Sequence, residues 1–432
     1  AELIIIKLAL ENGLEWDNPN RVEAFVLHRL EEEAQNGNSY IRANDLMYNI
    51  EDVLGDVPKE YIGQAVNGLV EKKRVGLDEV TDGYKRVYLT RYKNLERKVS
   101  NELLRILNGE NNFKFNNWEQ KVRELEERQG YEHTDEQWEG IRTVLENQVV
   151  VITGSAGSGK SSVVRAMLEA FSANAGGYSF AQTALSGRAS AKLQEVTGED
   201  GRTIHRLLEF NPFDGFVRNE FNQLEQDLIV LDEISLVGGY IFLDLIKAIK
   251  TGSKLIMLGD SSQLESIGCM NLAQDLIDSN SIPTVTLTKI HRQAQKSGII
   301  TESIKMRNGE QSIERSFSGR SIRGELQDFE FDVSIDKEGI KERVVNHFKK
   351  WYNELKDIMD VQIIVPVKSR GECCVEKINN DIQEIYNPRS KVKREFKVVT
   401  NKKKDECYIL REKDKVIITK NNYKTIDIHG ED

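Results

Sequence analysis

The stretch Val149-Val-Val-Ile-Thr-Gly154-Ser-Ala-Gly-Ser-Gly-Lys160-Ser161 decides the fold of this 432-residue chain. Its first five residues are β-branched, as in a buried strand, and its last eight match the pattern G-x-x-x-x-G-K-S/T. The sequence continues as Ser162-Val-Val-Arg-Ala-Met-Leu, which is typical of a helix. A strand that turns through glycines into a helix directs backbone N–H groups and the helix N-terminus at one point. The stretch therefore predicts a phosphate-binding loop within an α/β fold.

Each residue type in this loop has a chemical reason to be there. The glycines allow the backbone to approach phosphate oxygens closely, Lys160 reaches the β- and γ-phosphates, and the Ser161 hydroxyl binds Mg²⁺. The alternative interpretation is an ordinary glycine-rich turn. We expect ATP and Mg²⁺ as cofactors. The predicted nucleotide-binding residues of the loop are Gly154, Gly157, Ser158, Gly159, Lys160, Ser161 and Ser162.

Two further apolar stretches end in polar groups. Leu228-Ile-Val-Leu precedes Asp232 and Glu233, and Lys254-Leu-Ile-Met-Leu runs into Gly259-Asp-Ser-Ser-Gln263-Leu. Phosphoryl transfer needs a carboxylate that holds Mg²⁺ and a group that activates water. We assign the first role to Asp232 and the second to Glu233. The predicted parallel strands are 149–153, about 178–182, 228–232, 254–259 and 284–287.

The N-terminal region has a different pattern. Two apolar stripes at helical spacing, around Val22 to Leu30 and Ile62 to Val70, precede two short strands at 75–80 and 86–90. Asp82-Gly83 between the strands indicates a hairpin. This order outlines a winged-helix-like α+β domain, which either binds DNA or only mediates contacts with a protein partner.

Composition narrows the class of protein. The chain is 39% hydrophobic and 30% charged, and it has no apolar run long enough to cross a membrane. Its net charge of −10 means that any contact with DNA must be local. The densest basic stretch, 391–404, is better explained as a solvated hairpin than as a phosphate track. Four cysteines without a CxxC pair suit the cytoplasm, and six scattered histidines predict no transition metal.

The Gly-Asp-x-x-Gln-Leu motif at 259–264 resembles the third motif of superfamily-one helicases, in which the glutamine senses the γ-phosphate. Gly187-Arg-Ala, Thr203-Ile-His-Arg-Leu-Leu and Lys289-Ile-His-Arg-Gln narrow the resemblance to the RecD-like branch, in its long form with an N-terminal extension. The resemblance runs from about residue 21 to the end. Weaker matches follow at Asn379, Gln383, Asn387 and Asp414.

The resemblance implies further roles. Gln137 would read the adenine edge, Gln263 would sense the γ-phosphate, and Arg292 would be an arginine finger rather than the partner in a surface salt bridge. A polar loop residue is the alternative for Gln263. The expected catalytic residues are Lys160, Asp232, Glu233, Gln263 and Arg292.

A single-stranded DNA path is also implied by the resemblance. It would run along Ser186, Arg188, Thr203 and His205, although His205 fits equally well as a core histidine. Phe213 or Phe216, in a small insertion at about 200–222, would lie near a hairpin that separates strands.

The predicted domains are 1–95 (winged-helix-like), 96–133 (helical connector), 134–283 (first RecA-like domain) and 284–432 (second RecA-like domain). We expect the second domain to be incomplete, because the Thr-x-His-Lys-x-Gln-Gly and Ala-Leu-Ser-Arg elements of the family are absent before Asp432. The segment near the end would enter a β-barrel insertion.

These observations favour an ATP-dependent DNA helicase that moves on single-stranded DNA, or on duplex with a single-stranded tail, in repair or recombination. The resemblance implies 5′ to 3′ movement. A second hypothesis is a nucleotide-switched DNA-binding or regulatory module that does not unwind DNA. A third is a helicase that depends on a partner or a fused nuclease.

Overall fold

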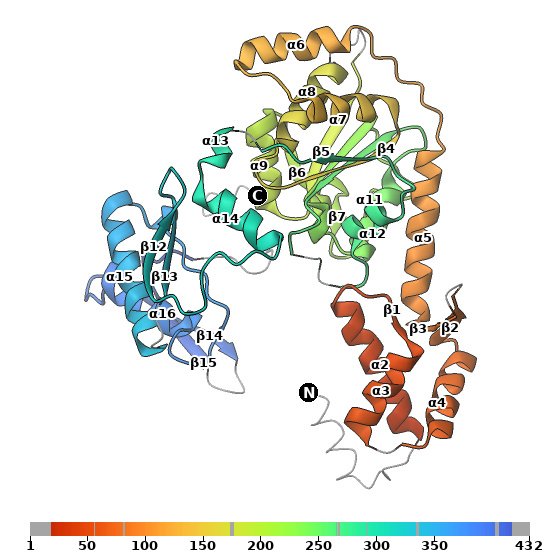
Figure 1. The fold of residues 1–432 in the computed structure, drawn as a ribbon, viewed down its shortest axis with the longest axis horizontal. Coiled ribbons are helices and arrows are strands. Elements are labelled where there is room, and N and C mark those ends of the chain that lie inside the picture. The colour runs from red at the N-terminus through yellow and green to blue at the C-terminus, as the bar shows by residue number, and fades with distance from the viewer. Residues whose placement is uncertain are drawn as a thin grey trace. The chain divides into compact units, whose positions relative to one another are not determined.

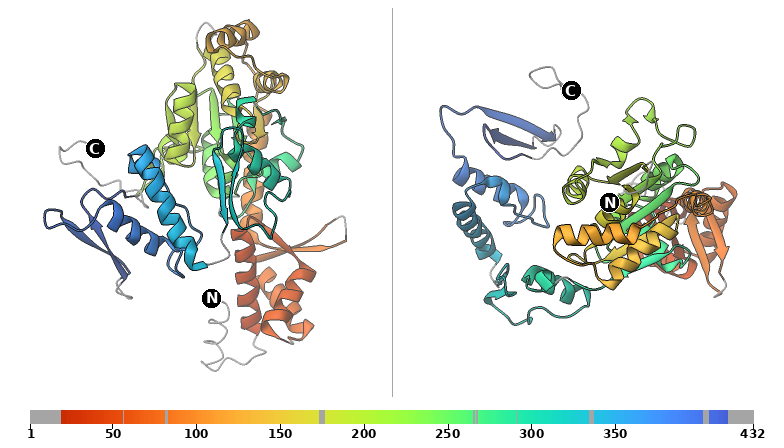
Figure 2. Two further views of the ribbon diagram at one scale, coloured as in Figure 1. Left: turned by 60° about the vertical axis from the view of Figure 1, so that its left-hand side comes forward. Right: turned by 90° about the horizontal axis from the view of Figure 1, so that it is seen from above.

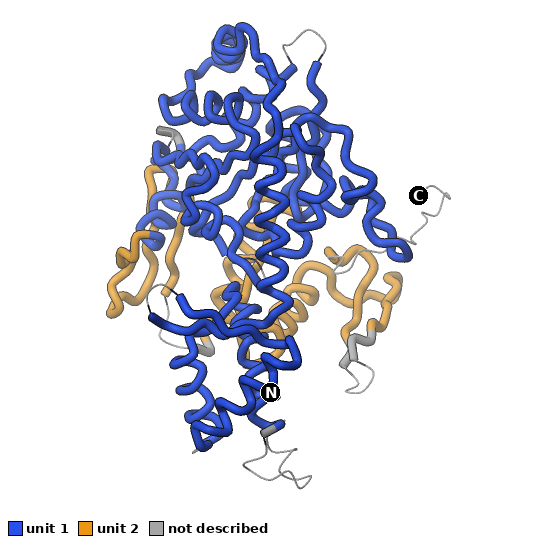
Figure 3. The backbone as a smooth tube through the Cα atoms, turned by 90° about the vertical axis from the view of Figure 1, so that its right-hand side faces the viewer, with its two compact units in different colours: residues 1–307 blue, residues 308–432 orange. Residues whose placement is uncertain are grey.

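A computed structural model describes residues 19–416, except 56, 81–82, 173–176, 265, 267, 291, 334–336 and 402–405. The sequence predictions for residues 1–18 and for the segment after 416 lie outside the described residues. The chain forms two compact units, Ala1–Arg307 and Asn308–Asp432 (Figure 3). None of the described helices combines the length and apolarity needed to cross a membrane.

The described part of the first unit begins with three helices and a small antiparallel sheet (Figure 1). The elements are α2 (Pro19–Gln35), β1 (Tyr40–Arg42), α3 (Ala43–Leu54), α4 (Lys59–Glu71), β2 (Val75–Glu79) and β3 (Lys85–Leu89). The sheet order is β1-β3-β2, and the expected hairpin is its β2–β3 pair. The predicted helical stripe is confirmed, since Val22, Phe25, Val26 and Leu30 are buried. Strand β1 was not predicted, because three residues are too few for a periodic signal. The winged-helix assignment stays a prediction.

A six-stranded parallel sheet forms the larger part of the first unit, as the sequence predicted. Its order is β11-β4-β10-β9-β5-β6, with β4 at Val149–Gly154, β5 at Phe180–Ala184, β6 at Gly201–Thr203, β9 at Leu228–Asp232, β10 at Lys254–Gly259 and β11 at Thr284–Leu287. Four predicted strands are found within one residue, β5 begins two residues late, and β6 was missed.

Helices cover both faces of this sheet (Figures 1 and 2). Val150, Ile152 and Ile256 face one core, with α6 (Trp118–Gln129), α7 (Asp135–Glu146), α8 (Lys160–Ser172) and α9 (Gly187–Thr197). Val149, Val151 and Leu255 face the other core, with α5 (Thr90–Leu107), α11 (Gly239–Ala248) and α12 (Leu272–Asp278). Successive residues of a strand face opposite cores because side chains alternate between the two faces of a sheet.

Helix α5 joins the N-terminal elements to the sheet. It begins at Thr90 and therefore crosses the predicted boundary at residue 95. Its apolar residues, such as Val99 and Leu103, are buried in the same core as the small N-terminal sheet and helix α11. The connector predicted at 96–133 therefore contains α6 and most of α5. Helix α5 packs against both the N-terminal elements and α11.

The remaining elements of the first unit are short. They are α10 (Ile204–Leu207), β7 (Phe210–Asn211), β8 (Gly215–Phe216), η1 (Ile234–Leu236), α13 (Arg292–Gln295) and α14 (Gly298–Arg307). Strands β7 and β8 form a small hairpin inside the predicted insertion.

The described residues of the second unit form two hairpins, two longer helices and one 3₁₀ helix. The elements are β12 (Gly319–Arg323), β13 (Phe329–Val333), α15 (Lys337–Leu355), η2 (Ile358–Asp360), α16 (Val375–Tyr386), β14 (Glu395–Asn401) and β15 (Glu406–Arg411). The compact units divide after Arg307 rather than at the predicted 283/284, and the predicted domain limits stay predictions.

In the second unit, polar residues that match the RecD-like pattern connect one element to the next. Gln383 and Asn387 both donate side-chain hydrogen bonds to the carboxylate of Asp414, at 2.5 and 2.7 Å. These residues therefore connect α16 to the chain that follows β15.

Candidate functional site

The predicted phosphate-binding loop follows β4 and leads into α8. Gly157 and Gly159 have φ angles of +80° and +84°, which L side chains rarely adopt. A Cβ atom at Gly154 would lie 2.6 Å from Ser158 Oγ, so only glycine fits there. The loop is closed by the Ser158 hydroxyl, which donates to the Ser155 carbonyl at 2.8 Å. The predicted glycines thus meet a steric requirement of this turn.

Lys160 opens helix α8 and is bound to its own loop. Its Nζ donates to the carbonyls of Gly154 (2.5 Å) and Ser155 (3.2 Å). Burial lowers the pKa of Lys160, and the charges of Asp260 and Asp232 oppose that shift. The ammonium group is therefore held by its own loop and lies near two carboxylates, and its contact with phosphates stays a prediction.

Asp232 and Glu233 end β9, two strands away from the loop. Burial raises the pKa of both carboxyl groups, and the charge of Asp232 raises that of Glu233 further. Glu233 has a φ of +54°, an uncommon backbone conformation for a residue other than glycine, and its N–H donates to Asp232 Oδ1 at 2.8 Å. Strained positions of this kind cluster at functional sites.

Strand β10 lies between β4 and β9, and its last residue is followed by Asp260. In register, Gly259 is the partner of Thr153, the residue before the loop. The carboxyl ends of parallel strands share one edge of the sheet, and ligands of open α/β sheets bind at that edge. The structure therefore brings together Lys160, Asp232, Glu233 and Asp260.

Three charged side chains at this site were not predicted from the sequence: Asp260, Arg307 and Lys192. Asp260 is buried and forms an ion pair with Arg307 from the end of α14. Lys192 on α9 lowers the pKa of Asp232 and of Glu233 through its charge. Asp260 falls inside a recognised motif and could have been selected. Arg307 and Lys192 carry no sequence signal.

Gln137 has no exposed surface. Its side chain accepts from the Thr134 N–H at 2.9 Å, which completes a capping box at the start of α7, and it donates to the Ser158 carbonyl at 3.2 Å. Gln137 therefore ties α7 to the phosphate-binding loop. Its role at the adenine edge stays a prediction.

The other two predicted catalytic residues follow strands β10 and β11 of the same sheet. Gln263 is exposed, and its N–H donates to the Asp260 carbonyl. Arg292 begins α13, although its side chain lies outside what the structure describes. A Cβ atom built on Gly157 would lie 3.0 Å from the Cβ of Ala294, so α13 packs against the loop. This backbone contact is compatible with the predicted finger.

Two residues of the predicted DNA path serve as helix caps. Ser186 caps α9 and Thr203 caps α10, each through a side-chain oxygen that accepts a backbone N–H. Ala184 and Thr203 are register partners on β5 and β6, so both caps lie near one edge of the sheet. Arg188 is exposed in the first turn of α9.

His205 is half-buried, with its ring 5.5 Å from Phe210 and 5.6 Å from Phe216. Phe216 is packed in this cluster, whereas Phe213 at the turn of the hairpin is 87% exposed. Of the two phenylalanines named for a strand-separating role, Phe213 is therefore the more exposed. The DNA contacts stay predictions.

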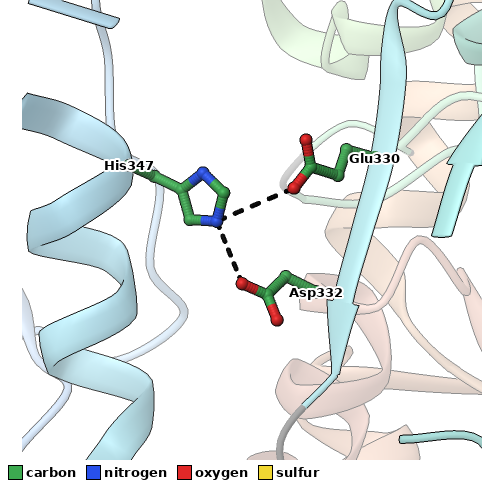
Figure 4. Close-up of side chains that lie close together, drawn as sticks. All are labelled: Glu330, Asp332 and His347. Atoms are coloured by element: carbon green, nitrogen blue, oxygen red, sulfur yellow. Dashed lines mark hydrogen bonds and ion pairs between the residues drawn. The ribbon is translucent and has the colours of Figure 1, made fainter. Parts of the chain in front are cut away.

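A separate polar cluster lies in the second unit. His347 on α15 points at Glu330 and Asp332 on β13, with Nε2 3.0 Å from Asp332 Oδ2 (Figure 4). Potential ligand atoms of the three residues lie within 4.8 Å of one another. Arg320 pairs with Glu330, however, and Arg343 pairs with Asp332. Because arginines already balance both carboxylates, the cluster is best described as an ion-pair network.

Comparison with known proteins agrees with the motifs. The model of a family described as an AAA domain matches residues 132–327. The ATP-dependent RecD2 DNA helicase of Deinococcus radiodurans is 29% identical over 259 residues, covering 59% of this chain and 33% of that protein. The RecBCD enzyme subunit RecD of Mycobacterium tuberculosis is 29% identical over 215 residues, covering 42% and 37%.

Among solved structures, the Pif1 helicase of Candida albicans is similar at 24% identity, with a TM-score of 0.33 and coverage of 41% of this chain and 44% of that one. The chain spans about a third of the length of the two RecD relatives. The phosphate-binding loop, the Asp-Glu pair and the Gly-Asp-x-x-Gln-Leu motif, together with these relatives, support the resemblance to the RecD-like branch of the superfamily-one helicases.

Proposed function

We propose that this chain is the ATP-hydrolysing part of a RecD-like DNA helicase that moves on single-stranded DNA. The observation that carries the proposal is the convergence of Lys160, Asp232 and Glu233 at the carboxyl ends of neighbouring parallel strands. A protein that only binds nucleotide needs the lysine and no acid that activates water. The Asp-Glu pair therefore favours hydrolysis.

Mg²⁺ fits the chemistry of the residues present. The ion prefers oxygen ligands, and the Ser161 hydroxyl and the Asp232 carboxylate would supply them. Burial raises the pKa of Asp232, and a divalent cation would offset that desolvation. When bound, Mg²⁺ would neutralise charge on the phosphates. Lys160 would orient the terminal phosphate, and Glu233 would position and deprotonate the attacking water.

Movement from 5′ to 3′, a substrate with a single-stranded tail, a role in repair or recombination, and a cytoplasmic location belong to the same proposal and rest on the family resemblance. Exposed groups near β5 and β6, such as Arg188 and Phe213, support a DNA path at that edge of the sheet. A protein partner for the N-terminal elements is part of the proposal as well.

The test compares ATP turnover of the purified chain and its Lys160→Ala variant, with and without single-stranded DNA. We expect DNA to stimulate the wild type, and the substitution to lower turnover at least ~100-fold, because a charge that stabilises the transferring phosphoryl group is lost. Lys121→Ala is the matched control, since Lys121 lies on α6 and pairs with Glu124.

Nucleotide binding without DNA-stimulated turnover would contradict the helicase proposal and favour the nucleotide-switched module. Strand displacement on a duplex with a 5′ tail, measured against one with a 3′ tail, then tests the direction of movement.

A further inference from the structure

The outward face of the small N-terminal sheet carries basic and aromatic side chains. Ile41 and Val87 are register partners that point into the core. Because side chains alternate along a strand, their neighbours Tyr40, Arg42 and Arg86 lie on the opposite face. We call Tyr40, Arg42, Tyr84, Arg86 and Tyr88 the arginine–tyrosine face.

Arg42 and Arg86 stand directly opposite each other on β1 and β3. The side chains of such cross-strand partners begin only about 4.5–5.5 Å apart, and like charges in this position destabilise a sheet. Neither arginine forms an ion pair with a carboxylate in the part of the chain that the structure describes. Pairing with carboxylates therefore does not explain the two arginines at these positions.

Tyrosine rings hold both guanidinium groups in place. The Arg42 guanidinium carbon is 4.7 Å from the Tyr84 ring centroid, and that of Arg86 is 4.4 Å from the Tyr40 centroid. Arg86 also donates to the Tyr84 hydroxyl at 3.0 Å. A guanidinium group that stacks on a ring still has N–H groups at its edge that can donate to an anion. Because the side chain is already held in place, it loses less conformational entropy when it binds an anion than a mobile arginine does.

The acidic residues nearby have other partners as well, although the charge of Glu96 also acts on Arg86. Asp78 is the register partner of Arg86 on β2, yet it accepts from the Tyr88 hydroxyl at 2.9 Å and lies 3.9 Å from Lys93. Glu96 also lies 3.9 Å from Lys93. The Arg42–Arg86 end of the face is therefore positive, although the chain as a whole carries a net charge of −10.

We propose that the arginine–tyrosine face is a docking surface for the phosphate backbone of nucleic acid, which Arg42 and Arg86 hold together. Phosphates recur along a nucleic-acid strand, and each can accept bidentate hydrogen bonds from arginine. Two adjacent guanidinium groups therefore match a row of phosphates better than they match a single carboxylate. An acidic protein needs a local basic contact to bind nucleic acid, and this face provides one. The proposal requires neither ATP nor hydrolysis.

The test measures binding of the purified chain to a fluorescein-labelled single-stranded oligonucleotide by anisotropy, without nucleotide, over a range of salt concentrations. The variant is Arg42→Gln with Arg86→Gln. Arg29→Gln with Arg91→Gln is the matched control, because it removes the same charge from the same part of the chain. Both control arginines already pair with glutamates.

We expect the test variant to bind about tenfold more weakly and the control within about twofold of wild type. Each phosphate contact contributes about 0.7 to the slope of log K against log salt for a single strand, so the slope should fall by about 1.4 in the test variant alone. Arg42→Lys with Arg86→Lys keeps the charge and should recover part of the affinity. This second variant also serves if the glutamine variant fails to fold.

Equal affinities and equal salt slopes in test and control variants would overturn the proposal. So would a loss of binding to vesicles containing an anionic lipid, with binding to the oligonucleotide intact. Because binding is measured without ATP, a failure here leaves the test of ATP turnover unaffected, and absence of turnover leaves this test unaffected.

Discussion

The two compact units place charged side chains in different environments, buried in the first and near the surface in the second. In the first unit, Lys160, Asp232 and Lys254 lie within or beside a parallel sheet whose strands β4 and β10 are buried throughout, and burial shifts the pKa of each. In the second unit, the buried apolar residues among those described are only Phe348, Cys374 and Ile378, and charges such as Asp332 are paired near the surface.

The difference indicates where chemistry can occur. A charge in a low-dielectric site acts strongly on its neighbours, whereas a surface pair is weakened by water and salt. The same residue types therefore supply a candidate reaction centre in one unit and a surface network in the other. Five predictions test this contrast, in order of decreasing expected effect.

Glu233→Gln should lower ATP turnover about 10²–10⁴-fold while leaving ATP affinity within a few-fold of wild type, because general-base catalysis is lost and the phosphate contacts remain. Burial raises the pKa of Glu233, so wild-type turnover should be lost at a higher pH than the ordinary pKa of a glutamate would give. Steady-state rates over pH and direct nucleotide binding check both points. A variant that turns over normally would remove Glu233 from the reaction.

Lys254→Met should lower the free energy of unfolding of the first unit by about 3 kcal/mol, since carbonyl groups at the end of α7 would lose their donor. Lys254 is fully buried, and its Nζ donates to the carbonyls of Val144 (3.2 Å), Leu145 (3.0 Å) and Asn147 (2.7 Å). Urea unfolding followed by tryptophan fluorescence measures the change. An unchanged midpoint would mean that this buried charge contributes nothing net.

The same residue predicts a pH dependence with a definite sign. Burial lowers the pKa of Lys254 to about 7 from its ordinary 10.5. Between these values the unfolded chain binds a proton that the folded chain does not, so stability rises with pH across this window. The difference in unfolding free energy between wild type and Lys254→Met should therefore grow from pH 7 to pH 9. A constant difference would show that the three carbonyls keep the ammonium form in the folded protein.

Arg307→Gln and Arg343→Gln form a matched pair across the two units. Arg307 pairs with Asp260, whose side chain is 5% exposed, and Arg343 pairs with Asp332, whose side chain is 22% exposed. Removing Arg307 should cost about 2 kcal/mol, because a buried carboxylate loses its partner, and removing Arg343 less than about 1 kcal/mol. Urea unfolding of both variants gives the comparison. Equal costs would contradict the contrast between the units.

His347→Ala should have the smallest effect, below about 1 kcal/mol, at the surface of the second unit. The hydrogen bond from His347 lowers the pKa of Asp332. The pair therefore stabilises the folded state above the ordinary pKa of an aspartate, and this stabilisation is lost as the pH falls through the lowered value. Thermal unfolding with and without Zn²⁺ is the check. A zinc-dependent rise in Tm that His347→Ala abolishes would identify a metal site in place of the ion-pair network.

The sequence by itself determined the local elements and their chemistry. A run of β-branched residues followed by glycines specified β4 and its loop, and apolar runs placed β9, β10 and β11 within one residue. Such signals are local, because strand and helix periods and glycine conformations depend on residues that are neighbours in the chain. The order of residues along the chain is therefore enough to select Lys160, Asp232 and Glu233 as candidates for the site.

Only the tertiary structure decided which of these elements are neighbours. The position of β10 between β4 and β9, the contact between Arg307 and Asp260, and the burial of Lys254 depend on strand order and packing across long separations in the chain. The Arg42–Arg86 pair depends in the same way on the register between β1 and β3, and β1 is too short to be seen in the sequence. The pattern of residue types along the chain indicates which secondary structure each segment can form. The contacts of each side chain depend instead on strand pairing and burial in three dimensions.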